Sequence, residues 1–124
     1  MRLGKKYLDE WKRALEFLEA VKRNLKDGDI KTAANREYFA LERAVICCLM
    51  IKSDKALKNH RKIWELSRDL DIDVYDLLRE LYDLRLQADY GKSSEITELN
   101  EKTIGEYLDK VEKTFEDLRE RYKL

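Results

Sequence analysis

The chain has 124 residues, a length that suits one domain over residues 1–124. Its 26 Lys and Arg residues balance 26 Asp and Glu residues, which argues against a protein that binds duplex nucleic acid over its whole surface. Pro is absent and only four Gly occur, whereas an all-β fold needs frequent turn residues. The longest apolar run, 44–51, is far below the roughly 20 residues that cross a bilayer. We therefore predict a helical, cytoplasmic protein without membrane contact.

Cysteine and histidine usage argues against a metal site. Cys47 and Cys48 are adjacent in the most apolar segment, and neighbouring side chains on a helix diverge. We predict that both are buried free thiols. His60 is the only histidine, and we predict no metal and no cofactor. The single Gln and four Asn, against 29 Lys plus Glu, resemble the composition of thermophile proteins.

Apolar residues recur every three or four positions over 7–25 and again over 30–51, which predicts two helices. Between them, Gly28 suits the left-handed end of the first helix and Asp29 suits the cap of the second. The short turn predicts antiparallel neighbours. The second half of 30–51 is apolar nearly all round, so it is either enclosed by other helices or faces a partner subunit.

Three further helices complete the pattern. A short one is expected over 58–70. The next, over 73–90, begins with a capping box of Asp73 and Asp76 and ends at Gly91. After a loop over 92–99, the last helix is capped by Asn100 or Thr103 and runs to about residue 122. The predicted fold is all-α: an up-and-down antiparallel helical bundle of four long helices plus one short helix.

Three segments carry a family resemblance. They are Ala-Ala-Asn-Arg-Glu-Tyr-Phe-Ala-Leu-Glu-Arg-Ala over 33–44, Lys-Asn-His over 58–60, and Arg-Leu-Gln-Ala-Asp-Tyr over 85–90. In this order and spacing they resemble the HEPN family of helical domains of higher eukaryotes and prokaryotes linked to nucleotide binding. The most similar branch has Arg-x-x-x-Asp-Tyr after the fourth helix, and the resemblance covers nearly the whole chain.

The resemblance implies a homodimer, and a prokaryotic partnership with a minimal nucleotidyltransferase in a toxin–antitoxin-like pair. Many members are ribonuclease toxins whose motif is an Arg followed after four to six residues by His. Here no His follows Arg85, and Asp89 and Tyr90 occupy that stretch. Whether the chain is an enzyme therefore stays open. In related systems the nucleotidyltransferase adenylylates a Tyr beside the motif, which makes Tyr90 the matching AMP acceptor.

The chemistry of RNA cleavage points to the same few residues. Attack by the 2′-hydroxyl needs a group that removes a proton and a group that stabilises charge on the phosphorane. Arg85 suits the second role, whereas Asp89 is a poor base unless buried. His60 is the other candidate base. At about 1.5 Å per residue, His60 lies roughly 15 Å along the short helix before residue 70, and Arg85 lies roughly 18 Å along the next helix after residue 73. Because a short loop joins residues 70 and 73, the two helices should be antiparallel and the two side chains should reach similar levels.

These distances predict that His60, Arg85, Asp89 and Tyr90 cluster at one pole of the bundle, where Met50 and Ile51 should also arrive. Three interpretations stay open. Arg85, Tyr90 and His60 bind RNA or a nucleotide; or Arg85, His60 and Asp89 catalyse metal-independent RNA cleavage; or the cluster only fixes the geometry of a non-catalytic helical scaffold. In the last case, Arg85 and Asp89 form an ordinary ion pair between residues i and i+4.

Overall fold

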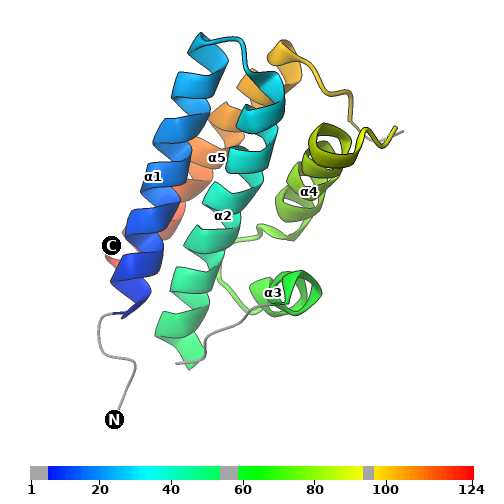
Figure 1. The fold of residues 1–124 in the computed structure, drawn as a ribbon. Helices are drawn as coiled ribbons and strands as arrows, with labels where there is room; N and C mark the ends of the chain where they lie inside the picture. Colours follow the sequence, from blue (N-terminus) through cyan, green and yellow to red (C-terminus); the bar gives the residue numbers. More distant parts are fainter. Residues whose placement is uncertain (1–5, 54–58, 94–96) are drawn as a thin grey trace.

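The computed structural model describes residues 6–53, 59–93 and 97–124, and five helices account for most of them. Figure 1 shows α1, α2, α4 and α5 running up and down the molecule, with the short α3 seen almost end-on beside α2. Their bounds are α1 Lys6–Lys26, α2 Ile30–Ser53, α3 His60–Ser67, α4 Tyr75–Tyr90 and α5 Glu101–Tyr122. The predicted all-α bundle of four long helices and one short helix is confirmed.

The turn between α1 and α2 has the predicted form. Gly28 adopts a φ of 75°, a left-handed conformation that glycine takes without strain. The Asp29 carboxylate then accepts a hydrogen bond from the Thr32 backbone N–H at 3.2 Å, which caps α2. As a result α1 and α2 lie side by side along most of their length (Figure 1).

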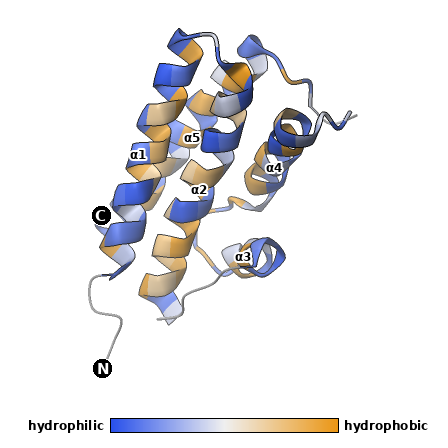
Figure 2. Ribbon diagram, viewed as in Figure 1, coloured by the Kyte–Doolittle hydropathy of each residue, from blue (hydrophilic) through white to orange (hydrophobic). Residues whose placement is uncertain are grey.

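The centre of the core is the second half of α2. In Figure 2 the lower part of α2 is coloured mostly as hydrophobic. Each residue from Ala44 to Met50 is buried, and Ile51 is 38% exposed. Of the two predicted explanations, enclosure by the chain's own helices is therefore sufficient for 44–50. Cys47 and Cys48 are buried free thiols, as predicted, and the hydrogen bond with Cys47 together with burial raises the pKa of Cys48.

The end of α3 and the start of α4 differ from the prediction. Helix α3 ends at Ser67 and not at Leu70, because the backbone N–H groups of residues 68–70 bond to carbonyls three residues back, in tight turns. The capping box predicted for α4 is absent: Val74 is the N-cap residue, and no side chain caps the helix. Asp73 instead accepts a bond from the Tyr75 N–H at 3.2 Å.

The ends of α4 and α5 follow the sequence signals. Gly91, at a φ of 65°, ends α4. Of the two predicted caps for α5, Asn100 is the one used, since its side chain accepts from the Thr103 N–H at 2.8 Å. In the part of the chain that the structure describes, no helix is long and apolar enough to span a membrane.

Candidate functional site

A buried polar network joins α2 to the start of α3. Tyr38 and Glu42 lie one turn apart on α2, and the Tyr38 hydroxyl donates to Glu42 Oε2. His60 Nδ1 contacts the same carboxylate oxygen and lies 3.2 Å from the Tyr38 hydroxyl. Trp64 Nε1 donates to the Tyr38 hydroxyl at 3.1 Å. The side chain of Glu42 is 5% exposed and that of His60 is 34% exposed, so the network runs from the core to the surface.

The directions of these hydrogen bonds fix the tautomer of His60. Burial raises the pKa of Tyr38, so its hydroxyl keeps its proton and donates it in the hydrogen bond to Glu42. The Tyr38 hydroxyl accepts from Trp64, and its own proton goes to the hydrogen bond with Glu42. Because a carboxylate oxygen only accepts, His60 Nδ1 donates to Glu42. In neutral His60 the lone pair is then on Nε2.

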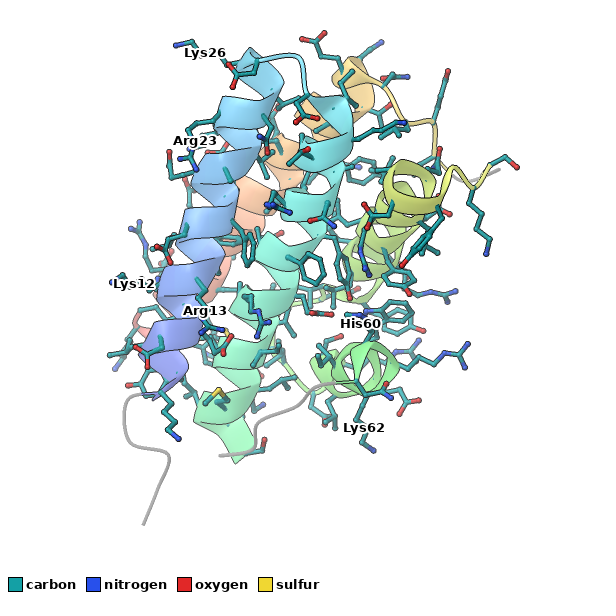
Figure 3. The ribbon with its side chains drawn as sticks, in the orientation of Figure 1. Lys12, Arg13, Arg23, Lys26, His60 and Lys62 are labelled. Atoms are coloured by element: carbon teal, nitrogen blue, oxygen red, sulfur yellow. The ribbon has the colours of Figure 1, made fainter. Side chains whose placement is uncertain are left out.

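His60 also lines a groove of about 860 Å³ between α3 and α4. Figure 3 shows His60 between the two helices. Trp64 and Tyr82 provide aromatic walls, with ring centroids 4.9 Å apart. Arg61, Arg79, Asp76 and Asp83 add charges of both signs to the lining.

Arg85 lies beside this network on α4. Its Cζ is 4.9 Å from the centroid of the Phe39 ring and 5.6 Å from that of Tyr82. Its Nε donates to Asp89 Oδ2 at 3.1 Å, and Asn35 of α2 donates to the same oxygen at 3.0 Å. Among the described residues, the two terminal nitrogens of Arg85 make no hydrogen bond, although the side chain is only 16% exposed.

The structure brings most of the predicted site residues together. The His60 ring centroid lies 5.5 Å from the Tyr82 ring, against which Arg85 also packs, and Asp89 follows one turn after Arg85. Tyr90 is adjacent in sequence but stands apart at the end of α4, 70% exposed.

The predicted place of Met50 and Ile51 is wrong. His60 contacts Tyr38 and Glu42 in the middle of α2, whereas Lys52, at the end of α2, bonds to the Asp69 carbonyl beyond the end of α3. Met50 is eight residues from Glu42, about 12 Å along a helix. The end of α2 therefore lies beside the far end of α3.

Sequence reasoning missed Glu42, Trp64 and Tyr82 as members of the site. A signal was present, because Tyr38 with Glu42 and His60 with Trp64 are both spaced four apart, on one face of a helix. Within the described ranges no group of three or more His, Cys, Asp and Glu side chains is placed to hold a metal ion.

Comparison with known proteins agrees with this architecture. The family model described as the HEPN domain matches residues 7–121, which includes all the site residues above. No curated protein matches the chain.

Proposed function

Because the chain belongs to the HEPN-domain family, we propose that it binds RNA or a nucleotide and acts as the homodimeric partner of a minimal nucleotidyltransferase in a toxin–antitoxin-like pair. Its family is one of helical domains related to nucleotides and RNA. The observation that carries the proposal is the state of Arg85. Its guanidinium is held against aromatic rings, yet only Nε is bonded within the described residues.

This state suits the recognition of phosphate. A guanidinium binds a phosphate through two parallel N–H groups, and the terminal nitrogens of Arg85 retain such donors. Packing against Phe39 and Tyr82 holds the group in place, so little conformational freedom is lost on binding. The terminal nitrogens are not among the buried polar atoms without a partner, so they face solvent and can bond to a phosphate in place of water.

Two substitutions at this ion pair should change RNA affinity in opposite directions. Arg85→Ala removes the phosphate-binding group, and we expect the affinity for a single-stranded RNA to fall by about tenfold or more. Asp89→Asn removes the competing carboxylate, and we expect the affinity to rise by a few-fold. Fluorescence anisotropy with labelled RNA measures both. Equal affinity for wild type and Arg85→Ala, or no binding by wild type, would contradict RNA binding at this site.

Tyr90 is the proposed AMP acceptor, and its 70% exposure leaves the hydroxyl accessible to a second protein. On co-expression with a minimal nucleotidyltransferase, we expect intact-mass spectrometry to show the addition of one AMP. Transfer forms a bond between the Tyr90 oxygen and the α-phosphorus of ATP and releases pyrophosphate. Tyr90→Phe should abolish the addition, and Tyr7→Phe, on α1, is the matched control. A modified Tyr90→Phe protein, or an unmodified wild type, would contradict this part of the proposal.

A second candidate function is metal-independent RNA cleavage. The hydrogen bond between His60 and Glu42 favours it, because it leaves a proton-accepting Nε2 on a residue that lines the groove and lies near Arg85. This arrangement supplies the base that is missing after Arg85 in the sequence.

A further inference from the structure

A second concave site lies on another face, between α1 and α2. It is a cleft of about 390 Å³ that contains three arginines and one carboxylate. We call it the arginine cleft, and its lining residues are Arg13, Glu16, Phe17, Ala20, Arg36 and Arg43. Figure 3 shows Arg13 on the front of α1, near α2, with Lys12 and Arg23 toward the outer side of α1. The cleft is a local excess of positive charge on a chain whose net charge is zero.

The positive charge of the cleft is incompletely neutralised. Arg43 donates from Nη1 to Glu10 at 3.1 Å, but its buried Nε has no hydrogen-bond partner among the described residues. Arg36 donates to the neutral amide oxygen of Asn35. No ion pair within the described ranges involves Arg13, Arg36 or Glu16. Even with Glu10 counted, the arginines outnumber the carboxylates.

Aromatic rings connect this cleft to Arg85. The Phe17 ring, in the cleft wall, lies 6.0 Å from the Phe39 ring, centroid to centroid. Phe39 also contacts Arg85, whose Cζ lies 4.9 Å from the ring centroid. Both rings are half-buried. Guanidinium groups therefore stand at both ends of a pair of partly exposed aromatic rings.

We propose that the arginine cleft is a second subsite for single-stranded RNA, in which the sugar–phosphate backbone passes from Arg85 over Phe39 and Phe17 to Arg13 and Arg36. This inference rests on RNA binding at Arg85 and extends it. Single-stranded nucleic acid is bound by positive grooves that follow the backbone and by aromatic rings on which bases stack. The cleft has both features, and arginine adds bidentate contacts to phosphate.

The lining favours RNA over a protein partner. The core of a protein interface is mostly apolar. The exposed large apolar residues of the described chain are Leu8, Leu15, Ile51 and Tyr90, and none of them lines the cleft. Charged arginines surround the one aromatic ring there, Phe17.

The test compares two double variants that remove the same charge. Arg13→Ala/Arg36→Ala removes two cleft arginines, whereas Lys12→Ala/Arg23→Ala removes two exposed cations of α1 that do not line the cleft. Anisotropy with a labelled oligouridylate is measured over a range of salt concentrations. We expect the cleft variant to bind at least about tenfold more weakly and its salt slope to fall by roughly 1.4, at about 0.7 per lost phosphate contact. The control should stay within about twofold of wild type.

Four outcomes would overturn the inference, and they are distinguishable. If Arg85→Ala weakens binding but the cleft variant does not, the subsite is wrong and the proposed function stands. If wild type binds no RNA, both fail. If the cleft variant changes only the oligomeric state in sedimentation, the cleft is an interface between copies of the chain. A measurement on the wild type does not depend on whether the variants fold. Thiouridine-containing RNA should photocrosslink to peptides that contain Phe17 or Phe39. Crosslinks confined to α3 and α4 would contradict the proposed path of the RNA backbone.

Discussion

Replacing Glu37 by Gln is expected to flatten the dependence of the protein's stability on pH. Glu37 is fully buried on α2, and neither carboxyl oxygen has a hydrogen-bond partner among the described residues. Burial without a partner disfavours the charged form and raises the pKa of Glu37 from 4.5 to about 9. In the folded protein at neutral pH, the side chain is therefore an uncharged acid.

The sign of the effect follows from proton binding. Between pH 4.5 and about 9 the folded state holds a proton on Glu37 that the unfolded chain has released. The free energy of unfolding must therefore fall as pH rises through this interval, by up to about 1.4 kcal/mol per pH unit. The lowered pKa values of Asp29 and Asp71 act on the acid side of this interval, below their ordinary 3.8.

Urea unfolding followed by far-UV circular dichroism across this interval measures the slope. Glu37→Gln has no proton to lose and should remove most of it. Glu37→Leu should in addition raise the free energy of unfolding at neutral pH, since it removes a partnerless buried polar group whose burial costs about 1–3 kcal/mol. Equal slopes for wild type and Glu37→Gln would show that Glu37 does not hold its proton through the interval.

The helices were predictable because local signals and packing agree. Each of these signals acts over one or two helical turns and has the predicted effect: the spacing of apolar side chains, the turn at Gly28 and Asp29, and the cap at Asn100.

The start of α4 was not predictable in the same way. Asp73 has the right type and spacing for a cap, but it bonds to Tyr75 N–H, two residues on, and Val74 takes the cap position.

The site was only partly predictable, for a physical reason. Helical rise placed His60 and Arg85 at similar levels along α3 and α4, and both do pack against Tyr82. The same arithmetic cannot give the crossing of α3 over α2, which depends on side-chain packing between helices. That crossing places His60 at the middle of α2, against Tyr38 and Glu42, and moves Met50 away from the site.

If the protein is a ribonuclease, His60→Ala and Arg85→Ala should each lower the rate of RNA cleavage by about 100-fold or more. His60 Nε2 would take the proton from the 2′-hydroxyl as its oxygen attacks phosphorus, and Arg85 would neutralise charge on the phosphorane. The bond between phosphorus and the 5′-oxygen then breaks, the leaving 5′-oxygen takes a proton from water, and the products are a 2′,3′-cyclic phosphate and a 5′-hydroxyl. Cleavage of a defined RNA, measured with a chelator present, should show these ends.

Glu42 should act on this reaction only through His60, since it is 5% exposed and bonds to Nδ1. Glu42→Gln keeps an acceptor for Nδ1–H but loses the negative charge, so we expect cleavage to fall by about tenfold while the affinity for RNA is unchanged. Nitrogen NMR of the single histidine measures its tautomer, which would not change if Glu42 only stabilised the fold. The wild type should show the Nδ1–H tautomer, and Glu42→Gln should show a mixture of the two tautomers. Glu65→Gln, an exposed position on α3, is the control.

Two results would contradict the ribonuclease candidate. Cleavage that survives both His60→Ala and Arg85→Ala comes from elsewhere. A wild type that binds RNA without cleaving it excludes ribonuclease activity and leaves the binding function.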